Sequence, residues 1–228
     1  MPRVSYAGSG KRGASFYLRK DLFMDHHFFA YMYRLRYIKR WSLMRNIVEE
    51  NVAEHSFHVA LLTHMLCTIA NEVYGRGIAT DKAVTMALFH DTTEVLTGDI
   101  PTPVKHHNPH ILSSFRSIEQ LAAERLVGMV PEKLRAVYEP LVKQAPQPSG
   151  QTPDPAEAEL KTYIKAADLL DAYLKCVTEL SAGNREFAVA KKQIEQSIES
   201  MNLPEIAYFL EHLAPSMEKT LDELTEEI

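Results

Sequence analysis

The feature that most constrains this chain is an apolar run that ends abruptly in a histidine–aspartate pair. Residues 83–89 (AVTMALF) are almost wholly apolar, and His90 and Asp91 follow directly. An imidazole and a carboxylate at the end of a buried segment lose their hydration, so they must be paired with other polar groups or hold a metal ion. Two further carboxylates, Glu94 and Asp99, follow shortly afterwards.

The composition limits the class of protein. The chain has 228 residues, of which 46% are hydrophobic, and this is enough for one packed core. A net charge of −5 gives no general attraction to nucleic acid polymers or acidic membranes. No stretch reaches the ~18 consecutive apolar residues of a membrane span, and the N-terminus has no apolar segment of the signal-peptide type. We therefore expect a cytoplasmic protein that binds neither a nucleic acid polymer nor a membrane.

The cysteine content points to the same compartment. Cys67 and Cys176 are the two cysteines, and both lie in apolar, helix-like patterns. Two cysteines cannot build a disulfide framework, so we expect buried free thiols. Free thiols are typical of proteins in the reducing cytosol.

The hydrophobic periodicity predicts an all-α fold. Apolar residues recur at three- and four-residue steps, which gives a helix one buried face, and strand-type alternation of useful length is missing. Residues 1–22 show no clear periodicity and are expected to be a flexible N-terminal extension, so residues 23–228 form the predicted single domain, a bundle of about eight helices. The predicted helices cover residues 23–38, 52–74, 80–91 and 109–128, a short stretch from Pro131, and residues 156–181, 185–200 and 204–220.

Three connections are expected to be loops. Residues 42–51 show no clean helical period. Residues 92–108 contain Gly98, Pro101 and Pro103, which disfavour a helix. Residues 145–155 contain four prolines and a glycine, a composition typical of exposed turns.

Four residues on or at the ends of apolar helices could hold a metal ion. His55 lies in the first turn of one predicted helix, His90 and Asp91 end another, and Asp168 lies at the edge of the buried stripe of a third. Two neutral imidazoles and two carboxylates suit zinc, manganese, cobalt or iron rather than calcium. The long spacings between these residues leave open the alternative that each is a satisfied structural residue.

Five segments of the chain, in order, resemble one family. They are similar to the HD-domain metal-dependent phosphohydrolases, and more closely to the bacterial 5′-deoxynucleotidases of the YfbR-like group. The resemblance runs from about residue 25 to about residue 222. The segments are RWSLMRN (residues 40–46), ENVAEHS (50–56), HDTTEVLTGDIPTPVK (90–105), IKAADLLDAYLKC (164–176) and ELSAGNREF (179–187).

The resemblance implies a reaction, hydrolysis of 2′-deoxyribonucleoside 5′-monophosphates to deoxyribonucleosides and phosphate. It implies His55, His90, Asp91 and Asp168 as ligands of one divalent transition metal, Co²⁺ or Mn²⁺, with Zn²⁺, Fe²⁺ or Cu²⁺ as alternatives. Asp91 would touch both the metal and the attacking water. Glu94 is not needed as a ligand and would act as general base or orient that water. Relatives form homodimers, so we expect a homodimer here.

The resemblance also implies how a substrate binds. Arg40 would clamp the phosphate, because a guanidinium matches phosphate geometry and neutralises its charge. Trp41 would pack against the sugar and leave a 2′-hydroxyl without a partner. Asp99 would accept a hydrogen bond from the 3′-hydroxyl, and the backbone of residues 100–102 would line the base. The full predicted substrate-binding set is Arg40, Trp41, His55, Asp91, Asp99, Ile100, Pro101, Thr102 and Asp168.

Two alternative functions stay open at this point. Within the same superfamily, a phosphodiesterase or a nucleoside triphosphohydrolase would act on larger nucleotides. A compact site with one metal and a phosphate clamp at Arg40 favours monophosphates over these. Outside the superfamily, a non-catalytic all-α protein would use a metal or nucleotide only for sensing or assembly.

Overall fold

The computed structural model describes residues 26–105, 107–144 and 154–226. In these ranges the chain is helical, and its one β-type pairing is an isolated bridge between Lys39 and Asn51. The prediction of an all-α fold is confirmed, and the predicted extension, residues 1–22, lies outside the described ranges. The α-helices are α1 (Phe28–Met32), α2 (Val52–Glu72), α3 (Thr80–Leu88), α4 (Glu94–Thr97), α5 (Thr102–Lys105), α6 (Pro109–Gly128), α7 (Glu132–Val142), α8 (Pro155–Ser181), α9 (Ala188–Met201), α10 (Pro204–His212) and α11 (Leu221–Glu226).

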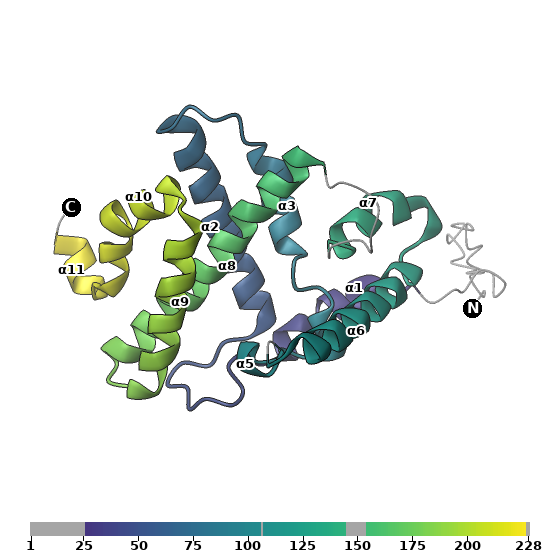
Figure 1. The fold of residues 1–228 in the computed structure, drawn as a ribbon, viewed down its shortest axis with the longest axis horizontal. Helices are drawn as coiled ribbons and strands as arrows, with labels where there is room; N and C mark the ends of the chain where they lie inside the picture. The colour runs from purple at the N-terminus through teal and green to yellow at the C-terminus, as the bar shows by residue number, and fades with distance from the viewer. Residues whose placement is uncertain (1–25, 106, 145–153, 227–228) are drawn as a thin grey trace, which may run out of the picture.

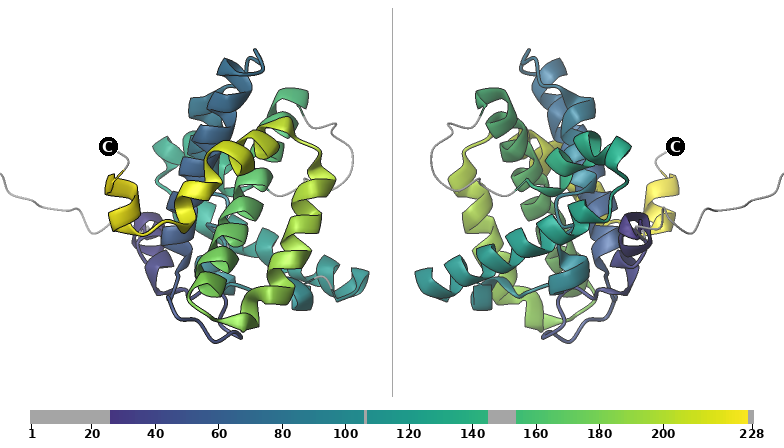
Figure 2. Two further views of the ribbon diagram at one scale, coloured as in Figure 1. Left: turned by 90° about the vertical axis from the view of Figure 1, so that its left-hand side faces the viewer. Right: turned by 90° about the vertical axis from the view of Figure 1, so that its right-hand side faces the viewer.

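The main core lies where α2, α3 and α8 pack together in the centre of the molecule (Figure 1). Helix α9 runs alongside α8, as Figure 2 shows, and α10 packs against α2. Leu66 of α2, Ala83 of α3, Leu170 of α8 and Phe209 of α10 have no exposed surface and form part of this core. Burial of such side chains is the main force that holds the bundle together.

A second, smaller core packs α1 against α6 and α7. Phe28 and Leu126 are fully buried there. The ring of Phe28 stacks on that of Phe89 at a centroid distance of 6.5 Å and lies 5.4 Å from that of Tyr138. Because Phe89 directly precedes His90, this core anchors the turn that carries the histidine–aspartate pair.

The start of α2 is fixed by its own sequence. The side chain of Asn51 accepts hydrogen bonds from the backbone N–H groups of Ala53 and Glu54, and Glu54 accepts one from the backbone N–H of Asn51. This reciprocal arrangement is a capping box, which satisfies N–H groups that a helix leaves unpaired at its first turn. The cap sets the position of His55, which lies in that turn.

The prediction of one helix over residues 23–38 is wrong. The described part of this segment holds α1 and a separate 3₁₀ turn, η2 (Leu35–Tyr37). The apolar residues of this segment pack against two different parts of the molecule. Phe28 packs into the core of α6 and α7, whereas η2 packs against α2. Tyr33, between them, is 69% exposed, so no continuous buried face holds one straight helix together.

The segment around the histidine–aspartate pair also differs from expectation. Helix α3 ends at Leu88, so His90 and Asp91 lie in the following turn rather than on the helix. The predicted loop 92–108 contains the short helices α4 and α5. Proline is tolerated in the first turn of a helix because the N–H it lacks has no partner there, and Pro103 is the second residue of α5.

The C-terminal part follows the predicted order with shifted boundaries. Helix α8 begins at Pro155, which was expected in a loop, and the side chain of Asp154 caps it. The helix predicted over residues 204–220 divides into α10 and a 3₁₀ segment, η4 (Ala214–Glu218), and α11 follows. Cys67 and Cys176 are buried free thiols, as predicted. No helix in the described ranges is both long and apolar enough to cross a membrane.

Candidate active site

The turn after α3 presents His90 in a defined tautomer. Nδ1 of His90 lies 2.7 Å from the carbonyl oxygen of Ala87, and this carbonyl can only accept a hydrogen bond. Nδ1 therefore carries the proton, and the lone pair of Nε2 is free to bind a metal ion. A backbone carbonyl commonly orients a metal-binding histidine in this way.

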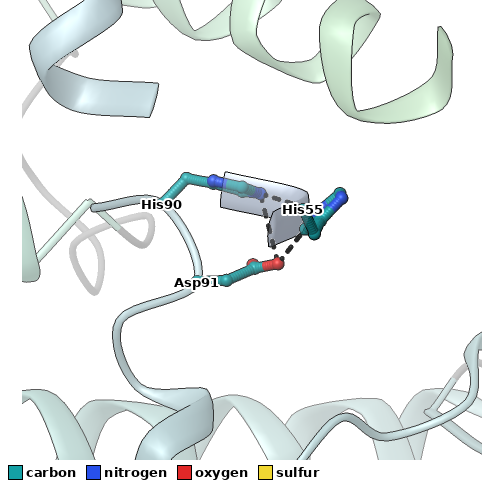
Figure 3. Close-up of side chains that lie close together, drawn as sticks. All are labelled: His55, His90 and Asp91. Carbon is teal, nitrogen blue, oxygen red and sulfur yellow. Dashed lines mark hydrogen bonds and ion pairs between the residues drawn. The ribbon is translucent and has the colours of Figure 1, made fainter. Parts of the chain in front are cut away.

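Three predicted ligands converge on one point. Figure 3 shows His55, His90 and Asp91 pointing toward one another, with His55 coming from α2 and the other two from the turn after α3. Nε2 of His90 lies 3.2 Å from Oδ2 of Asp91 and 3.3 Å from Nε2 of His55. Nε2 of His55 lies 3.3 Å from the same Asp91 oxygen. Three ligand atoms from two parts of the chain thus form a closed triangle.

This triangle fits a transition metal ion. Donor atoms that share one ion at about 2.1 Å lie roughly 3.0 to 3.4 Å from one another in octahedral or tetrahedral geometry. The three distances, 3.2 to 3.3 Å, fall within that range. Two imidazole nitrogens with a carboxylate are also a suitable donor set for such an ion.

Asp168 joins this group through His55. Its Oδ1 lies 3.3 Å from Nε2 of His55, and its Oδ2 lies 2.7 Å from Nζ of Lys165. Asp168 lies farther from at least one of His55, His90 and Asp91 than the ligand atoms of these three residues lie from one another. The structure therefore brings the four predicted ligands together, with Asp168 at the edge of the set.

The other side of the His55 ring faces a second polar group. Nδ1 of His55 lies 2.6 Å from Oδ2 of Asp171 and 2.7 Å from Nη1 of Arg40. One ring nitrogen cannot both donate to Asp171 and accept from Arg40. Because Nε2 needs its lone pair for a metal, we assign the proton to Nδ1, which donates it to Asp171.

Arg40 is held behind His55 by carboxylates. Its Nη1 forms an ion pair with Glu50 and lies 3.4 Å from Oδ2 of Asp171. The side chain is 11% exposed. On spacing alone, Glu50, His55 and Asp171 could hold a second cation, and the guanidinium takes that place. Arg40 is thus next to the predicted ligands, with one of its nitrogens already committed to protein partners.

The electrostatics of the ligand group favour a bound cation. Burial alone would lower the pKa of His55, but contacts with Asp168, Asp171 and Asp91 raise it well above its ordinary value. Burial would likewise raise the pKa of Asp91, but His90 and His55 hold it well below its ordinary value. The carboxylates therefore stay ionised and attract positive charge, either as protons on the imidazoles or as a metal ion that displaces them.

Glu94 is a carboxylate with an unused oxygen. Its Oε2 is buried and has no hydrogen-bond partner among the described residues. Burial, together with the nearby charges of Asp91 and Asp99, raises the pKa of Glu94 to about 9. A buried acceptor without a partner is costly, and such groups concentrate at functional sites.

Trp41 follows Arg40 directly and is linked to Asp99. The backbone N–H of Trp41 donates to Oδ2 of Asp99 at 3.1 Å. Trp41 has a φ of 55°, in the left-handed region that non-glycine residues rarely adopt. Its ring lies 5.4 Å from that of Phe187, and its buried Nε1 has no partner among the residues that the structure describes. The strained backbone and the free donor place a polar, unsatisfied edge at the site.

The predicted site residues differ in how closely the structure groups them. Arg40 and the four predicted ligands are linked by direct contacts, and Asp99 is linked to Trp41. Residues 100–102 follow Asp99 directly and enter α5 at Thr102, and none of their side chains is buried. Their predicted role at the base stays a prediction.

Sequence reasoning missed three residues that contact the site, which are Glu50, Asp171 and Lys165. Lys165 and Asp171 lie three residues before and after Asp168 on α8, a spacing that places them near the same face of a helix. That spacing was the available signal. Glu50 had none, because it reaches Arg40 only through the backbone pairing of residues 38–40 with residues 50–52.

The fold and the site together define a class of protein. A histidine in one helix, a histidine–aspartate pair after the next and an aspartate in a third, all within an α-helical bundle, are the features of the HD-domain phosphohydrolases. The chain has the same fold as an HD-domain phosphohydrolase from Listeria innocua, with a TM-score of 0.68 at 23% identity, over 89% of this chain and 96% of that one.

Sequence comparison narrows the class to one family. The model of the family described as 5′-deoxynucleotidase YfbR-like matches residues 27–217, so the chain belongs to this family. It is 43% identical to the 5′-deoxynucleotidase YfbR of Shigella boydii over 88% of this chain and 96% of the relative. It is 44% identical to a 5′-deoxynucleotidase of Vibrio cholerae over 88% of this chain and 99% of the relative. The predicted family and enzyme class, a phosphoric monoester hydrolase of the 5′-deoxynucleotidase type, are confirmed.

Proposed function

We propose that the site between α2, α8 and the turn after α3 hydrolyses 2′-deoxyribonucleoside 5′-monophosphates to deoxyribonucleosides and phosphate. The observation that carries this proposal is the triangle of His55, His90 and Asp91, with Oε2 of Glu94 left without a hydrogen-bond partner among the described residues. Relatives that share 43 to 44% of their residues with this chain are named 5′-deoxynucleotidases, and this supports the substrate class.

One divalent transition metal is the proposed cofactor, held by His55, His90, Asp91 and Asp168. When bound, such an ion polarises a phosphate oxygen and lowers the pKa of water, which makes hydrolysis possible at neutral pH. Co²⁺ and Mn²⁺ are the ions we propose first, with Zn²⁺, Fe²⁺ and Cu²⁺ as alternatives. A structural neighbour with a TM-score of 0.54 and 21% identity, the HD phosphohydrolase of cyanophage S-2L, is described as bound to dA and one catalytic Zn²⁺.

The proton and charge chemistry falls to the other residues. Glu94 lies close enough to Asp91 for the charge of Asp91 to raise its pKa. With a divalent cation bound nearby, Glu94 is ionised rather than protonated and accepts the proton of the attacking water. Arg40 neutralises charge on the phosphate. The half-buried Trp41 side chain forms the wall beside the sugar, where a 2′-hydroxyl would lose its hydration without gaining a partner.

The sugar and base are held near Trp41, Asp99 and residues 100–102. Asp99 uses Oδ2 to accept the Trp41 N–H, so its Oδ1 is available to the 3′-hydroxyl. The backbone of residues 100–102 lines the base. Because backbone atoms are the same for every residue type, they make few contacts that would select one base. This arrangement selects for the deoxyribose 5′-monophosphate and leaves the base identity open.

Phosphate release from dAMP tests the proposed function. Purified protein is assayed with added Co²⁺ or Mn²⁺, with and without a chelator, and with AMP, dATP and a cyclic dinucleotide as parallel substrates. The proposal predicts metal-dependent release from dAMP and much slower release from AMP. Preferential turnover of dATP or of the cyclic dinucleotide would favour a triphosphohydrolase or a phosphodiesterase, and no turnover at all would favour a non-catalytic binding protein.

Asp168→Ala tests the ligand set. Loss of one of four ligands should lower metal affinity by at least about 10-fold, measured as bound Co²⁺ or Mn²⁺ per chain after dialysis. Glu157→Ala, in the first turn of the same helix, serves as control and should retain metal. Full metal content in the Asp168 variant would remove this residue from the set.

We propose that the enzyme works in the cytoplasm as a homodimer. The free buried thiols of Cys67 and Cys176 support a reducing compartment. Phe57 and Leu61, one turn apart on α2, are 56% and 53% exposed, and such an apolar pair is typical of an interface between subunits. Light scattering coupled to gel filtration measures the mass, and a monomer at micromolar concentration would contradict the dimer.

A further inference from the structure

We propose that Lys165 is a phosphate-binding residue of this site, which holds Asp168 with one N–H of its ammonium and meets the substrate phosphate with the others. The inference rests on the proposed function, because it takes the substrate to be a phosphate ester. It adds a second cation to the phosphate clamp that Arg40 was expected to provide alone.

The two oxygens of Asp168 face two different partners. Oδ1 faces Nε2 of His55 at 3.3 Å, and Oδ2 lies 2.7 Å from Nζ of Lys165. A single carboxylate group therefore separates the ammonium from the metal-ligand triangle. A phosphate that binds at this triangle carries its negative charge within reach of Lys165.

Lys165 has donors to spare on its solvent side. An ammonium has three N–H groups, and in the described residues Asp168 is the one hydrogen-bond partner of Lys165. Its side chain is 60% exposed although it lies one turn from a site residue. Two N–H groups are thus free for an incoming anion that enters from solvent.

Arg40 is placed differently. Among the lysines and arginines that the structure describes, Arg40 and Lys165 are the two that contact a predicted metal ligand. Arg40 lies on the Nδ1 side of His55, is 11% exposed, and spends Nη1 on Glu50 and Asp171. Lys165 lies with Asp168 on the Nε2 side, where the ligand atoms converge. Lys165 is therefore the accessible cation on the reacting side of the ring.

Binding of inorganic phosphate to the Co²⁺-loaded protein tests this inference without turnover. Isothermal titration compares the wild type with Lys165→Met, with Lys165→Arg, and with the control Lys161→Met. Lys161 lies on the same helix and, among the described residues, pairs with Glu157 alone, at 2.8 Å. Thermal melting confirms that each variant is folded, and Lys165→Gln replaces the Met variant if that one is not.

Lys165→Met should weaken phosphate binding by about 10-fold or more, because a charge-assisted hydrogen bond is lost. Its affinity for Co²⁺ should also fall, because Lys165 orients the ligand Asp168 from outside the ligand shell, so phosphate affinity is compared at saturating Co²⁺. Lys165→Arg, which keeps the charge, should restore phosphate affinity to within a few-fold, and Lys161→Met should match the wild type. In turnover of dAMP, KM should rise in Lys165→Met.

Either of two results would overturn the inference. One is no phosphate binding by the Co²⁺-loaded wild type. The other is unchanged phosphate affinity in Lys165→Met at saturating Co²⁺, and a simultaneous loss of Co²⁺ affinity would make Lys165 a residue that only positions Asp168. A protein that binds phosphate through Lys165 but does not hydrolyse dAMP would contradict the proposed function and leave Lys165 in place.

Discussion

Two carboxyl groups of this protein, that of the half-buried Glu94 and that of the buried Glu179, have pKa values that move in opposite directions. Burial alone would raise the pKa of Glu179, but hydrogen bonds from Lys175, from backbone N–H groups that include that of Ile47, and from Asn184 hold it at about 2. For Glu94, burial and nearby negative charge raise the pKa to about 9. Glu179 has both oxygens hydrogen-bonded, whereas Oε2 of Glu94 has no partner in the described part of the chain.

The difference distinguishes Glu179, which stabilises the fold around the site, from Glu94, for which we propose a role in the reaction. Glu179 is fully buried on α8 and ties down the segment of residues 47–48. That segment continues into Glu50, the partner of Arg40. A satisfied carboxylate stabilises the fold because its charge is compensated, whereas an unsatisfied one keeps acceptor capacity for a substrate or a proton. The comparison predicts that mutations of the two residues affect different properties.

Glu94→Gln should cause the largest effect, on activity alone. An amide cannot take up a proton, so kcat for dAMP should fall about 100- to 10,000-fold. Metal content and the free energy of unfolding should stay close to those of the wild type, because the amide keeps the shape of the side chain. Steady-state kinetics, metal analysis and urea unfolding measure the three quantities. Glu124→Gln, on the exposed face of α6, is the control, and an undiminished kcat in the Glu94 variant would contradict the assigned role.

Glu179→Ala should act mainly on stability. The substitution removes the carboxylate that pairs with the ammonium of Lys175 and accepts the N–H of Ile47. The Lys175 side chain is 6% exposed, so its charge would stay buried without a partner carboxylate. Breaking a buried pair in this way costs about 3 kcal/mol, measured by urea unfolding. Glu195→Ala removes the partly exposed pair with Lys191 and should cost less than about 1 kcal/mol. Equal losses in the two variants would mean that Glu179 is no more than a surface charge.

Acid should destabilise the protein through Glu179. The folded-state pKa, about 2, lies below the ordinary value of 4.5, so the unfolded chain takes up the proton first as pH falls. The stabilisation by Glu179 is then complete above about pH 4.5 and is lost between there and about pH 2. The difference in unfolding free energy between the wild type and Glu179→Gln should shrink over that window. A difference that is constant from pH 6 to about pH 3 would show that the charge contributes nothing.

Periodicity alone was enough to predict the all-α class and the start of α2 near residue 52. The pattern of the chain named the four candidate ligands, but only the resemblance decided for a metal site, because a separation of 35 positions from His55 to His90 carries no geometric information. Contacts that depend on tertiary structure escaped prediction altogether. Asp171 and Glu50 meet Arg40 only because α8, the start of α2 and the segment before it pack together, and the break between α1 and η2 follows from two different packing partners.

Asn184→Ala should have the smallest effect on the free energy of unfolding. It tests how much of the stabilisation of the Glu179 charge comes from this one side chain. Nδ2 of Asn184 donates to Oε2 of Glu179 at 2.7 Å and to the carbonyl of Arg45 at 2.6 Å. Its Oδ1 accepts from the backbone N–H of Glu186. The alanine variant should lose about 1 to 2 kcal/mol in urea unfolding.

The acid sensitivity of the Asn184 variant distinguishes two explanations of that loss. If the hydrogen bond to Glu179 matters, the pKa of Glu179 rises in the variant, and the acid-induced loss of stability begins at higher pH than in the wild type. If the cap on Glu186 matters instead, the loss of stability is the same at every pH. Gln193→Ala, on the exposed face of α9, controls for removal of a surface amide. A loss that does not depend on pH would mean that only Lys175 and the backbone N–H groups stabilise the ionised Glu179. The difference between Glu179 and Glu94 would then rest on fewer hydrogen bonds.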